Sequence, residues 1–292
     1  MSLAAATVEE VDRAAVQRWL PSLDAWLLPE TFYGVQHTWP QLYRSDGDGR
    51  FFLITDGDQL LSHCATRIVT VQSGATTFAA CLLGSVVTDP ECRGQGLAGL
   101  VLAAALRANA ARATHTVLWA ERPDLYARAG FCLGTDETCL ILARRPRPLL
   151  DGVRLLQFDD HQALCELHAQ KPCRVERSPR TMSALLTTPG MTTVVLERNH
   201  TVVAYACCGK GADLHGHWHE LGGTDANLAL LLPAALHLAE QTDAVLLLPP
   251  YRQHLRELLA PHTIAAAAVP GPMVRSVGEP MPACWFDGLD SV

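Results

Sequence analysis

The segment VVTDPECRGQGLAG, residues 86–99, joins a nearly continuous apolar run to an Ala- and Leu-rich run. The first run, Thr77–Thr88, is typical of a buried strand, and the second, Leu97–Arg112, is typical of a helix. Glycines in such a loop let backbone N–H groups converge on one oxygen, the helix dipole adds about half a positive charge, and Arg93 adds a full one. The segment therefore predicts a site for a phosphate or a pyrophosphate.

Two kinds of phosphate ligand compete for this loop. Gly94, Gly96 and Gly99 spell GxGxxG, and Glu121 lies 22 residues beyond Gly99 at the end of a predicted strand, as in the dinucleotide fingerprint. That pattern would indicate a nicotinamide-dependent oxidoreductase. However, the five mostly polar residues 89–93 separate the strand from Gly94, whereas the fingerprint requires a tight turn at that point. The oxidoreductase is therefore the less favoured alternative.

An antiparallel meander is predicted before the loop. Its three strands cover residues 50–55, 59–71 and 77–88. Asp56-Gly57 and Gly74 supply the two turns, since both are typical hairpin sequences. Thr7 and Glu10 match a capping box, which predicts that the chain opens with a helix.

The pattern after the long helix continues the same domain. Thr116–Ala120 is β-branched and aromatic and predicts a short strand, and Pro123 stands where a helix begins. Two further strands, around Cys132 and Cys139, are expected to finish the sheet. The first half is thus predicted to be one complete mixed sheet with helices.

A stretch rich in arginine and proline separates two similar halves. ARRPRPLLDG, residues 143–152, contains three arginines and two prolines, which break regular structure. We place a domain boundary here, between residues 1–147 and residues 148–292. The second half repeats the series of strands and helices, which indicates a tandem duplication. Where it should have its own phosphate loop it reads HELGGTDAN, residues 219–227, and Asp225 without an arginine would repel a pyrophosphate.

Composition and charge narrow the class of protein. A chain of 292 residues with 49% apolar content can build two packed cores. Its 23 Lys and Arg against 30 Asp and Glu give a net charge of −7, so we expect neither a nucleic acid nor a membrane as partner. The longest apolar stretches fall well short of the ~20 residues that span a bilayer, and the N-terminus does not resemble a signal peptide. Ten cysteines without a CxxC pair favour reduced thiols and a cytoplasmic protein.

Two motifs together resemble one family. The loop contains the pattern Arg-x-x-Gly-x-Ala in Arg93, Gly96 and Ala98. Further on, LWAERPDLYARAGF, residues 118–131, places Tyr126 four residues before a Gly-Phe pair. With these motifs and the meander before them, residues 77–131 resemble the GNAT superfamily of N-acetyltransferases. The resemblance implies an α/β fold (α+β, with a mixed sheet) built as two tandem GNAT-like domains, of which the second is degenerate.

The resemblance implies a site for acetyl-CoA as co-substrate. In the family, a strand backbone pairs with the pantetheine arm, and here that strand carries Val86, Val87 and Thr88. Amides of the following loop cradle the pyrophosphate, and the matching positions are Arg93, Gly94, Gln95, Gly96, Leu97, Ala98 and Gly99. The arm lies where two parallel strands splay, here those that end near Thr88 and begin near Thr116. A bulge near Gly84 would help to open that gap.

The family transfers the acetyl group directly to an amine in a ternary complex, which requires a base, an oxyanion donor and an acid. Tyr126 matches the family's acid, and Glu121 is the first candidate for the base. Water and the terminal carboxylate of Val292 stay open, the latter by analogy with two-domain relatives such as N-myristoyltransferases. The resemblance thus implies an N-acetyltransferase that acts on a small-molecule or peptide primary amine. A sensor that binds acyl-CoA without turnover is the other alternative.

Three alternating histidines form a further pattern. His215, His217 and His219 would share one face of a strand, a geometry suited to a metal. Histidines on a solvated face explain the pattern more simply, and Gly216 weakens the strand, so no metal is expected. Glu220 faces the opposite way and is expected to line a cleft between the halves. The sequence gives no indication of the oligomeric state.

Overall fold

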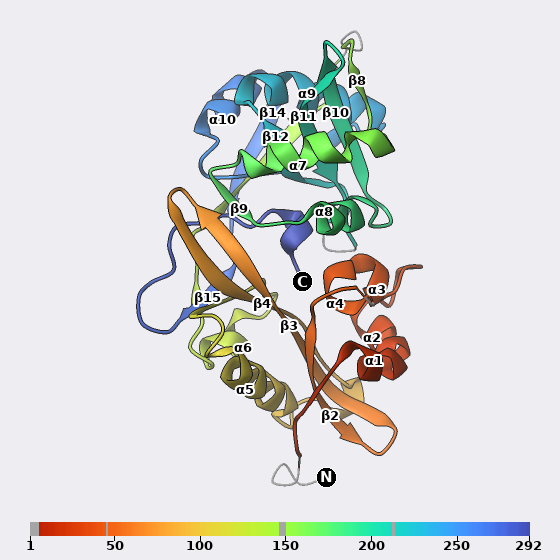
Figure 1. The fold of residues 1–292 in the computed structure, drawn as a ribbon, viewed down its shortest axis with the longest axis vertical. Helices are drawn as coiled ribbons and strands as arrows, with labels where there is room; N and C mark the ends of the chain where they lie inside the picture. Colours follow the sequence, from red (N-terminus) through yellow and green to blue (C-terminus); the bar gives the residue numbers. More distant parts are fainter. Residues whose placement is uncertain (1–5, 45, 146–149, 212–213) are drawn as a thin grey trace.

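The computed structural model of the chain describes residues 6–44, 46–145, 150–211 and 214–292. These residues form two mixed sheets, one above the other in Figure 1, and helices pack on both faces of each sheet. The fold is therefore mixed α/β with two sheets, as the sequence predicted. Within the described ranges, every helix is too short or too polar to cross a membrane.

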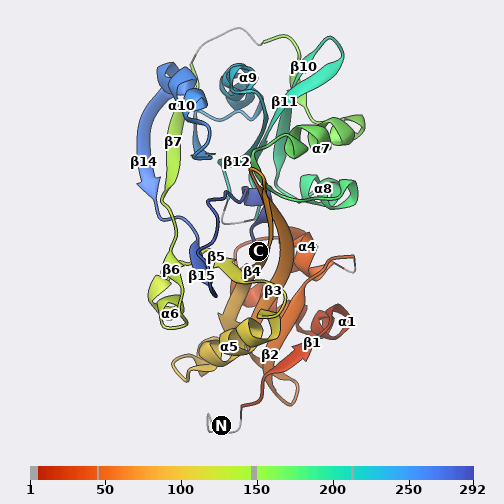
Figure 2. The same ribbon diagram turned by 60° about the vertical axis from the view of Figure 1, so that its left-hand side comes forward.

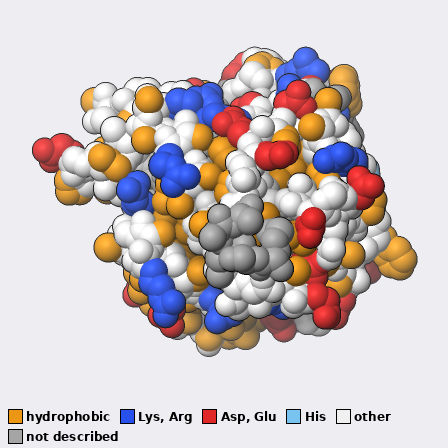
Figure 3. Space-filling view, turned by 90° about the horizontal axis from the view of Figure 1, so that it is seen from below, with side chains coloured by type: hydrophobic (Ala, Val, Ile, Leu, Met, Phe, Trp, Pro, Cys, Tyr) orange, Lys and Arg blue, Asp and Glu red, His pale blue; other side chains and the backbone are white. Residues whose placement is uncertain are grey.

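The first sheet contains, in spatial order, β1 (Glu9–Val11), β2 (Arg50–Asp56), β3 (Gln59–Ser73), β4 (Thr76–Thr88), β5 (His115–Leu118), β15 (Met273–Ser276) and β6 (Cys132–Leu133), and β9 (Cys173–Val175) pairs with the end of β3. The predicted meander β2–β3–β4 is confirmed, and Gly57 and Gly74 turn it with φ of 57° each. Seen from below, the first half carries acidic, basic and hydrophobic side chains interspersed (Figure 3).

Helices cover both faces of the first sheet (Figures 1 and 2). One face packs against α5 (Leu97–Asn109), and α6 (Pro123–Ala127) lies near the edge of that face. The other face packs against α1 (Arg13–Val16), the 3-10 helix η2 (Gln17–Trp19), α2 (Leu20–Leu27), α3 (Val35–Thr38) and α4 (Pro40–Tyr43). These helices bury Trp19, Leu23 and Leu42 against the sheet.

The helix predicted from Thr7 and Glu10 is wrong at its start. Glu10 lies in the edge strand β1 opposite Phe52, and its carboxylate accepts from the Arg50 guanidinium at 2.8 Å. The helix begins only after Asp12, whose carboxylate caps it by accepting from the backbone N–H of Ala15 at 2.9 Å. Pairing with β2 thus outweighs the local capping signal.

The second sheet contains, in spatial order, β14 (Thr263–Val269), β7 (Glu137–Ala143), β13 (Asp243–Leu248), β12 (His217–Gly223), β11 (Thr201–Cys208), β10 (Thr192–Arg198) and β8 (Val153–Leu155). On one face lie α9 (Asp225–Leu238), α10 (Gln253–Leu259) and the 3-10 helix η5 (Ala260–His262). On the other lie the 3-10 helix η4 (Phe158–Asp160), α7 (His161–Ala169) and α8 (Pro179–Leu186). β12 and β13 are parallel, as β4 and β5 are in the first sheet.

The two halves exchange a strand. β7 pairs with β13 and β14 in the second sheet, so the prediction that the strand around Cys139 finishes the first sheet is wrong. β15, from near the end of the sequence, takes a place between β5 and β6 of the first sheet instead. Figure 2 shows β7 in the upper sheet and β15 in the lower one. The predicted boundary between residues 147 and 148 lies outside the described residues.

After β15 the chain crosses back to the second half. This tail, residues 277–292, passes β9, where the Ser73 hydroxyl donates to the carbonyl of Ala283 at 2.6 Å. It then forms the 3-10 helix η6 (Gly288–Asp290) and ends between the two sheets (Figures 1 and 2). The tail therefore touches both halves.

A buried ionic cluster holds the tail on the second half. It consists of Lys171, Arg177, Glu220, Asp287 and Asp290, whose side chains are each at most 1% exposed. Arg177 donates to Glu220 at 2.8 and 2.9 Å and to Asp290 at 2.7 and 2.9 Å. Lys171 bridges Glu220 at 3.0 Å and Asp287 at 2.8 Å. Burial alone would raise the pKa of Glu220, but Arg177 and Lys171 hold that pKa well below its ordinary value.

The exchange of strands predicts that neither half folds alone. A fragment of residues 1–147 lacks β15, which leaves β5 and β6 without their common partner, and it exposes the apolar β7. We expect this fragment to lack a cooperative thermal transition by circular dichroism, and co-expression with residues 148–292 to restore one. A sharp transition in the isolated fragment would contradict the interdependence.

The ionic cluster predicts a contrast between two neighbouring arginines. Arg177→Met leaves Glu220 and Asp290 buried without their main cation, which costs about 3–5 kcal/mol. Arg180→Met is the matched control, because that side chain is 79% exposed and its pair with Asp46 is worth at most about 1 kcal/mol. Urea unfolding measures both. Equal losses of stability in the two variants would refute the role of the cluster.

Candidate active site

The parallel strands at the centre of the first sheet separate part-way along. β4 and β5 pair at Ala80–His115, Cys81–Thr116 and Leu82–Val117, and their pairing ends there. Just beyond, the register between β4 and β3 shifts. The predicted bulge near Gly84 is thus confirmed, and it lies where β4 and β5 cease to pair with each other.

The bulge is held by a buried histidine. Ser85 has a φ of 52°, an uncommon value for a residue with a side chain. The Nδ1 of His63 on β3 donates to the Ser85 carbonyl at 2.7 Å. Burial lowers the pKa of His63 to about 4, so its ring is neutral at pH 7. This bond ties the peptide between Ser85 and Val86 to β3 at the point where the register shifts.

The loop after β4 is exposed and ends at the start of α5. The 3-10 helix η3 (Pro90–Cys92) comes first, and the side chain of Arg93 then folds back so that its Nε donates to the Thr88 carbonyl at 3.3 Å. Gly94 and Gly96 have φ of 79° and 78°, and Gly96 has no side chain with which to cap α5. The first N–H groups of a helix have no acceptor within it. The loop therefore presents the first amides of α5 and a guanidinium at the surface, and the phosphate site predicted for it stays a prediction.

The equivalent place in the second half is closed by its own side chains. Thr224 caps α9 by accepting from the N–H of Asn227 at 3.3 Å. Asp225 occupies the first turn of α9 and pairs with Arg252 at 2.6 Å. The helix dipole is thus already met by a carboxylate, which leaves this helix N-terminus unsuited to a phosphate.

Tyr126 and Glu121 lie beyond the end of β5. Tyr126 is on α6, half-buried, and its ring meets Phe131 edge-on with centroids 6.1 Å apart. Burial raises the pKa of Tyr126 to about 12, and Cys64 and Glu121 add to this effect. Glu121 itself is exposed in the loop before α6. The structure therefore brings the predicted acid and the first candidate base into one electrostatic neighbourhood.

The end of the tail lies on the bulge. A methyl group on Gly84 would collide with the carbonyl oxygen of Val292, the last residue of the printed sequence. The carbonyl of Ser291 accepts from Gln41 at 3.0 Å and from the Lys210 ammonium at 2.6 Å. We call the face of the first sheet on which Val292 and Phe286 pack the tail face. It is opposite the face that packs against α5.

The structure adds Trp119 and Glu137, which the sequence did not single out. Trp119 follows β5 directly, and its ring meets Phe286 of the tail edge-on with centroids 6.0 Å apart. Glu137, the first residue of β7, is close enough to Trp119 for the indole N–H to influence its pKa. Burial raises the pKa of Glu137 to about 7, although the Trp119 N–H opposes the rise. Glu137 was missed because its strand was assigned to the wrong sheet.

The histidines and Glu220 do not form the sites considered for them. His215 precedes β12 and is exposed, His217 is half-buried, and His219 is buried, with its Nε2 next to the carbonyl of Gly209 at 3.1 Å. Glu220 lies inside the ionic cluster and lines no cleft. In the described residues, the group with metal-ligand spacing is His168, Glu220 and Asp287, and Lys171 already bridges its two carboxylates.

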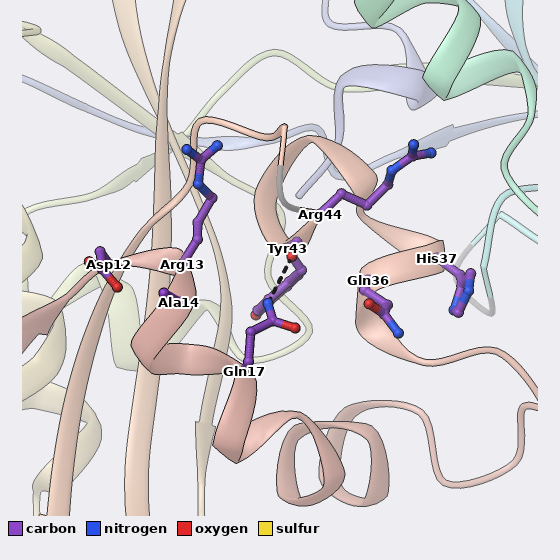
Figure 4. Close-up of a pocket in the computed structure, with 8 residues that line it drawn as sticks. All are labelled: Asp12, Arg13, Ala14, Gln17, Gln36, His37, Tyr43 and Arg44. Carbon is purple, nitrogen blue, oxygen red and sulfur yellow. Dashed lines mark hydrogen bonds between the residues drawn. The ribbon is translucent and has the colours of Figure 1, made fainter.

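A hollow of about 710 Å³ opens between α1 and η2 on one side and α3 and α4 on the other (Figure 4). It is lined by Asp12, Arg13, Ala14, Gln17, Gln36, His37, Tyr43 and Arg44. The Gln17 amide donates to the backbone carbonyl of Tyr43 at 3.2 Å across the hollow. The Tyr43 ring itself is fully buried beside His63, with centroids 6.1 Å apart. This buried tyrosine stands between the hollow and the bulge.

Comparison with known proteins assigns the first half to a family. Residues 10–134 match the family model described as the acetyltransferase (GNAT) domain. No curated protein matches the sequence. Among solved structures, a conserved protein of Enterococcus faecalis described as a probable N-acyltransferase matches with a TM-score of 0.73 and 13% identity, over 94% of this chain and 73% of that one.

Two further solved structures also match over nearly the whole chain. Eis1 from Mycobacterium abscessus has a TM-score of 0.63 and 13% identity, over 93% of this chain and 73% of that one. Saccharomyces cerevisiae N-myristoyltransferase with bound myristoyl-CoA has a TM-score of 0.59 and 11% identity, over 94% and 80%. At these identities the likeness is one of fold, and it extends over both sheets.

Proposed function

We propose that this chain, whose residues 10–134 belong to the GNAT acetyltransferase family, transfers an acetyl group from acetyl-CoA to a primary amine. The observation that carries the proposal is the open glycine loop at the start of α5, directly beside the splayed end of β4 and β5. An anion site next to a gap between strands suits a long molecule with a pyrophosphate at one end and a thioester at the other. The acceptor amine then approaches from the tail face.

The residues present fit acetyl-CoA as substrate. The amides of residues 94–98 and the Arg93 guanidinium would hold the pyrophosphate, and the backbone of Val86, Val87 and Thr88 would pair with the pantetheine arm. Gly94 and Gly99 leave open space where side chains would otherwise stand. The resident Asp225–Arg252 pair at α9 makes the second half unsuited to the same role, so we assign one acetyl-CoA site to the chain.

The reaction follows from simple bond accounting. The amine nitrogen attacks the thioester carbonyl carbon, the C–S bond breaks, and the sulfur leaves as a thiolate. Tyr126 gives its proton to that thiolate, and its raised pKa keeps it protonated at every ordinary assay pH. The amine must lose a proton to a base. The sequence offers Glu121 for this role and, where the chain ends at Val292, the α-carboxylate on the bulge.

If the loop binds the pyrophosphate, a carboxylate placed in it should weaken the binding of acetyl-CoA without lowering the stability of the fold. Gly99→Asp places a carboxylate in the first turn of α5, where the helix dipole favours it and a side chain meets open space. The same carboxylate repels a pyrophosphate, so we expect the Kd for acetyl-CoA to rise about tenfold or more. Isothermal titration calorimetry measures this Kd, and thermal unfolding checks the fold.

Gly99→Ala is the matched control for that variant. It fills the same space without charge and should keep the Kd of the wild type. Weaker binding in both variants would mean that bulk rather than charge matters. Unchanged binding in both variants would show that the pyrophosphate does not bind at this loop.

If Tyr126 is the acid, loss of its hydroxyl should lower turnover and leave the binding of acetyl-CoA unchanged. Tyr126→Phe removes the hydroxyl but keeps the ring against Phe131, so the kcat for release of CoA thiol should fall about 100-fold at an unchanged Kd for acetyl-CoA. A thiol reagent follows the release with a panel of primary amines. If acetyl-CoA binds but the wild type turns over no amine and Tyr126→Phe behaves identically, the chain is an acyl-CoA sensor instead.

A further inference from the structure

We propose that Cys173 and Cys284 form a modification site, at which a small peroxide oxidises the two thiols to a disulfide that fixes the tail covalently to β9. Cys173 is the first residue of β9 and is buried, and Cys284 is half-buried in the middle of the tail. The proposal rests on contacts between the tail and β9, and it does not depend on acetyl transfer.

Hydrogen bonds on both sides of Cys284 hold its backbone beside Cys173. On one side, the Ser73 hydroxyl donates to the Ala283 carbonyl at 2.6 Å, and Ser73 pairs with Cys173 across β3 and β9. On the other side, the Trp285 N–H donates to the Cys173 sulfur at 2.8 Å. A backbone nitrogen lies about 2.4 Å from the Cα of the preceding residue, so the Cα of Cys284 is within about 5 Å of that sulfur.

The two thiols also lie on the same face of β9. Cys173 and Val175 are both buried, and because side chains alternate along a strand, they share one face. Cys284 packs against the core cluster that contains Val175 and Phe286. The Cys284 side chain therefore meets β9 on the side from which the Cys173 sulfur projects, and it is on this side that a disulfide would form.

The surroundings favour a reactive thiolate at Cys173. The Cys284 thiol, as a hydrogen-bond donor, and the Trp285 N–H lower the pKa of Cys173, although burial and the nearby Asp287 oppose them. The same interaction, together with burial, raises the pKa of Cys284, which stays a thiol. A thiolate beside a second thiol is the arrangement in which oxidation by a peroxide proceeds to a disulfide.

The oxidation balances as a two-electron step. The Cys173 thiolate attacks one oxygen of hydrogen peroxide, the O–O bond breaks, and the departing hydroxide takes up the proton that the Cys173 thiol had lost. The sulfur is then a sulfenic acid. The Cys284 sulfur attacks it, the S–O bond breaks, and the oxygen leaves as water with the proton of the Cys284 thiol. Two thiols thus become one disulfide, and the peroxide is reduced to two molecules of water.

The disulfide would change how the tail is held. In the reduced chain, hydrogen bonds and packing hold the tail at Cys284, and the ionic cluster holds it only further along, from Asp287 onward. Between these points Phe286 packs edge-on against Trp119. Cys173 and Trp285 are 112 residues apart, so the disulfide closes a long loop and restricts the unfolded chain. Oxidation should therefore stabilise the fold and fix the tail on the first sheet.

The test is oxidation of the full chain with hydrogen peroxide, followed by alkylation of the remaining thiols, digestion without reductant and mass spectrometry. We expect peptides joined through Cys173 and Cys284, at a peroxide concentration that oxidises the exposed Cys132 about tenfold less. The oxidised chain should have a Tm about 5 °C higher than the reduced chain, and a dithiol reductant should reverse the shift.

Cys284→Ser and Cys132→Ser are the matched variants. Without the Cys284 thiol, the sulfenic acid of Cys173 should persist and be trapped by dimedone, and the rise in Tm should disappear. Cys132→Ser removes an exposed thiol but keeps the pair, so it should behave as the wild type. The mapping of the wild type needs no variant. If peroxide oxidises Cys132 or another cysteine there while Cys173 and Cys284 stay reduced, the proposal is overturned and acetyl transfer is unaffected.

Discussion

The exchange of β7 and β15 is the constraint on which the rest of this structure depends. β5 is only four residues long, and with β15 on one side it pairs with β4 on the other for three residue pairs before the two separate. The chain continues from β15 into the tail. The ionic cluster fixes the tail on β12, and the tail then ends over Gly84. The gap between strands and the groups around it are thus set by pairing between halves.

The halves share an architecture but differ at one helix N-terminus each. At α5 the N-cap is a glycine, so no side chain interacts with the positive end of the helix dipole, and Arg93 lies in the loop just before the helix. At α9 a threonine caps the helix and a carboxylate answers the dipole, with Arg252 paired to that carboxylate. At α9 the helix dipole interacts favourably with the chain's own carboxylate. At α5 the same interaction can stabilise a bound anion instead. A duplicated fold can in this way reserve one copy for binding and the other for support.

Local signals in the sequence predicted much of the first half. Asp56-Gly57 and Gly74 specify hairpins through positive φ, the Ala- and Leu-rich run specifies α5, and the loop follows from its glycines. Alternation along a strand fixes which side chains are buried but not which strand lies beside it, so β7 was given the wrong neighbours. Glu137 was missed for the same reason. Its environment is made by Trp119 and by chain more than 130 residues later.

The position of β15 also sets the order in which the chain can fold. Met273 pairs with Leu118, a separation of 155 residues, whereas the meander β2–β3–β4 closes through turns of two residues. Contacts so distant along the chain form late and slowly, because a long loop must close first. During synthesis the first sheet therefore leaves the ribosome with β6 unpaired and one edge of β5 open, and it is completed only after translation has passed residue 276. The protein matures as one unit, and chaperones would meet its first half with an open strand edge.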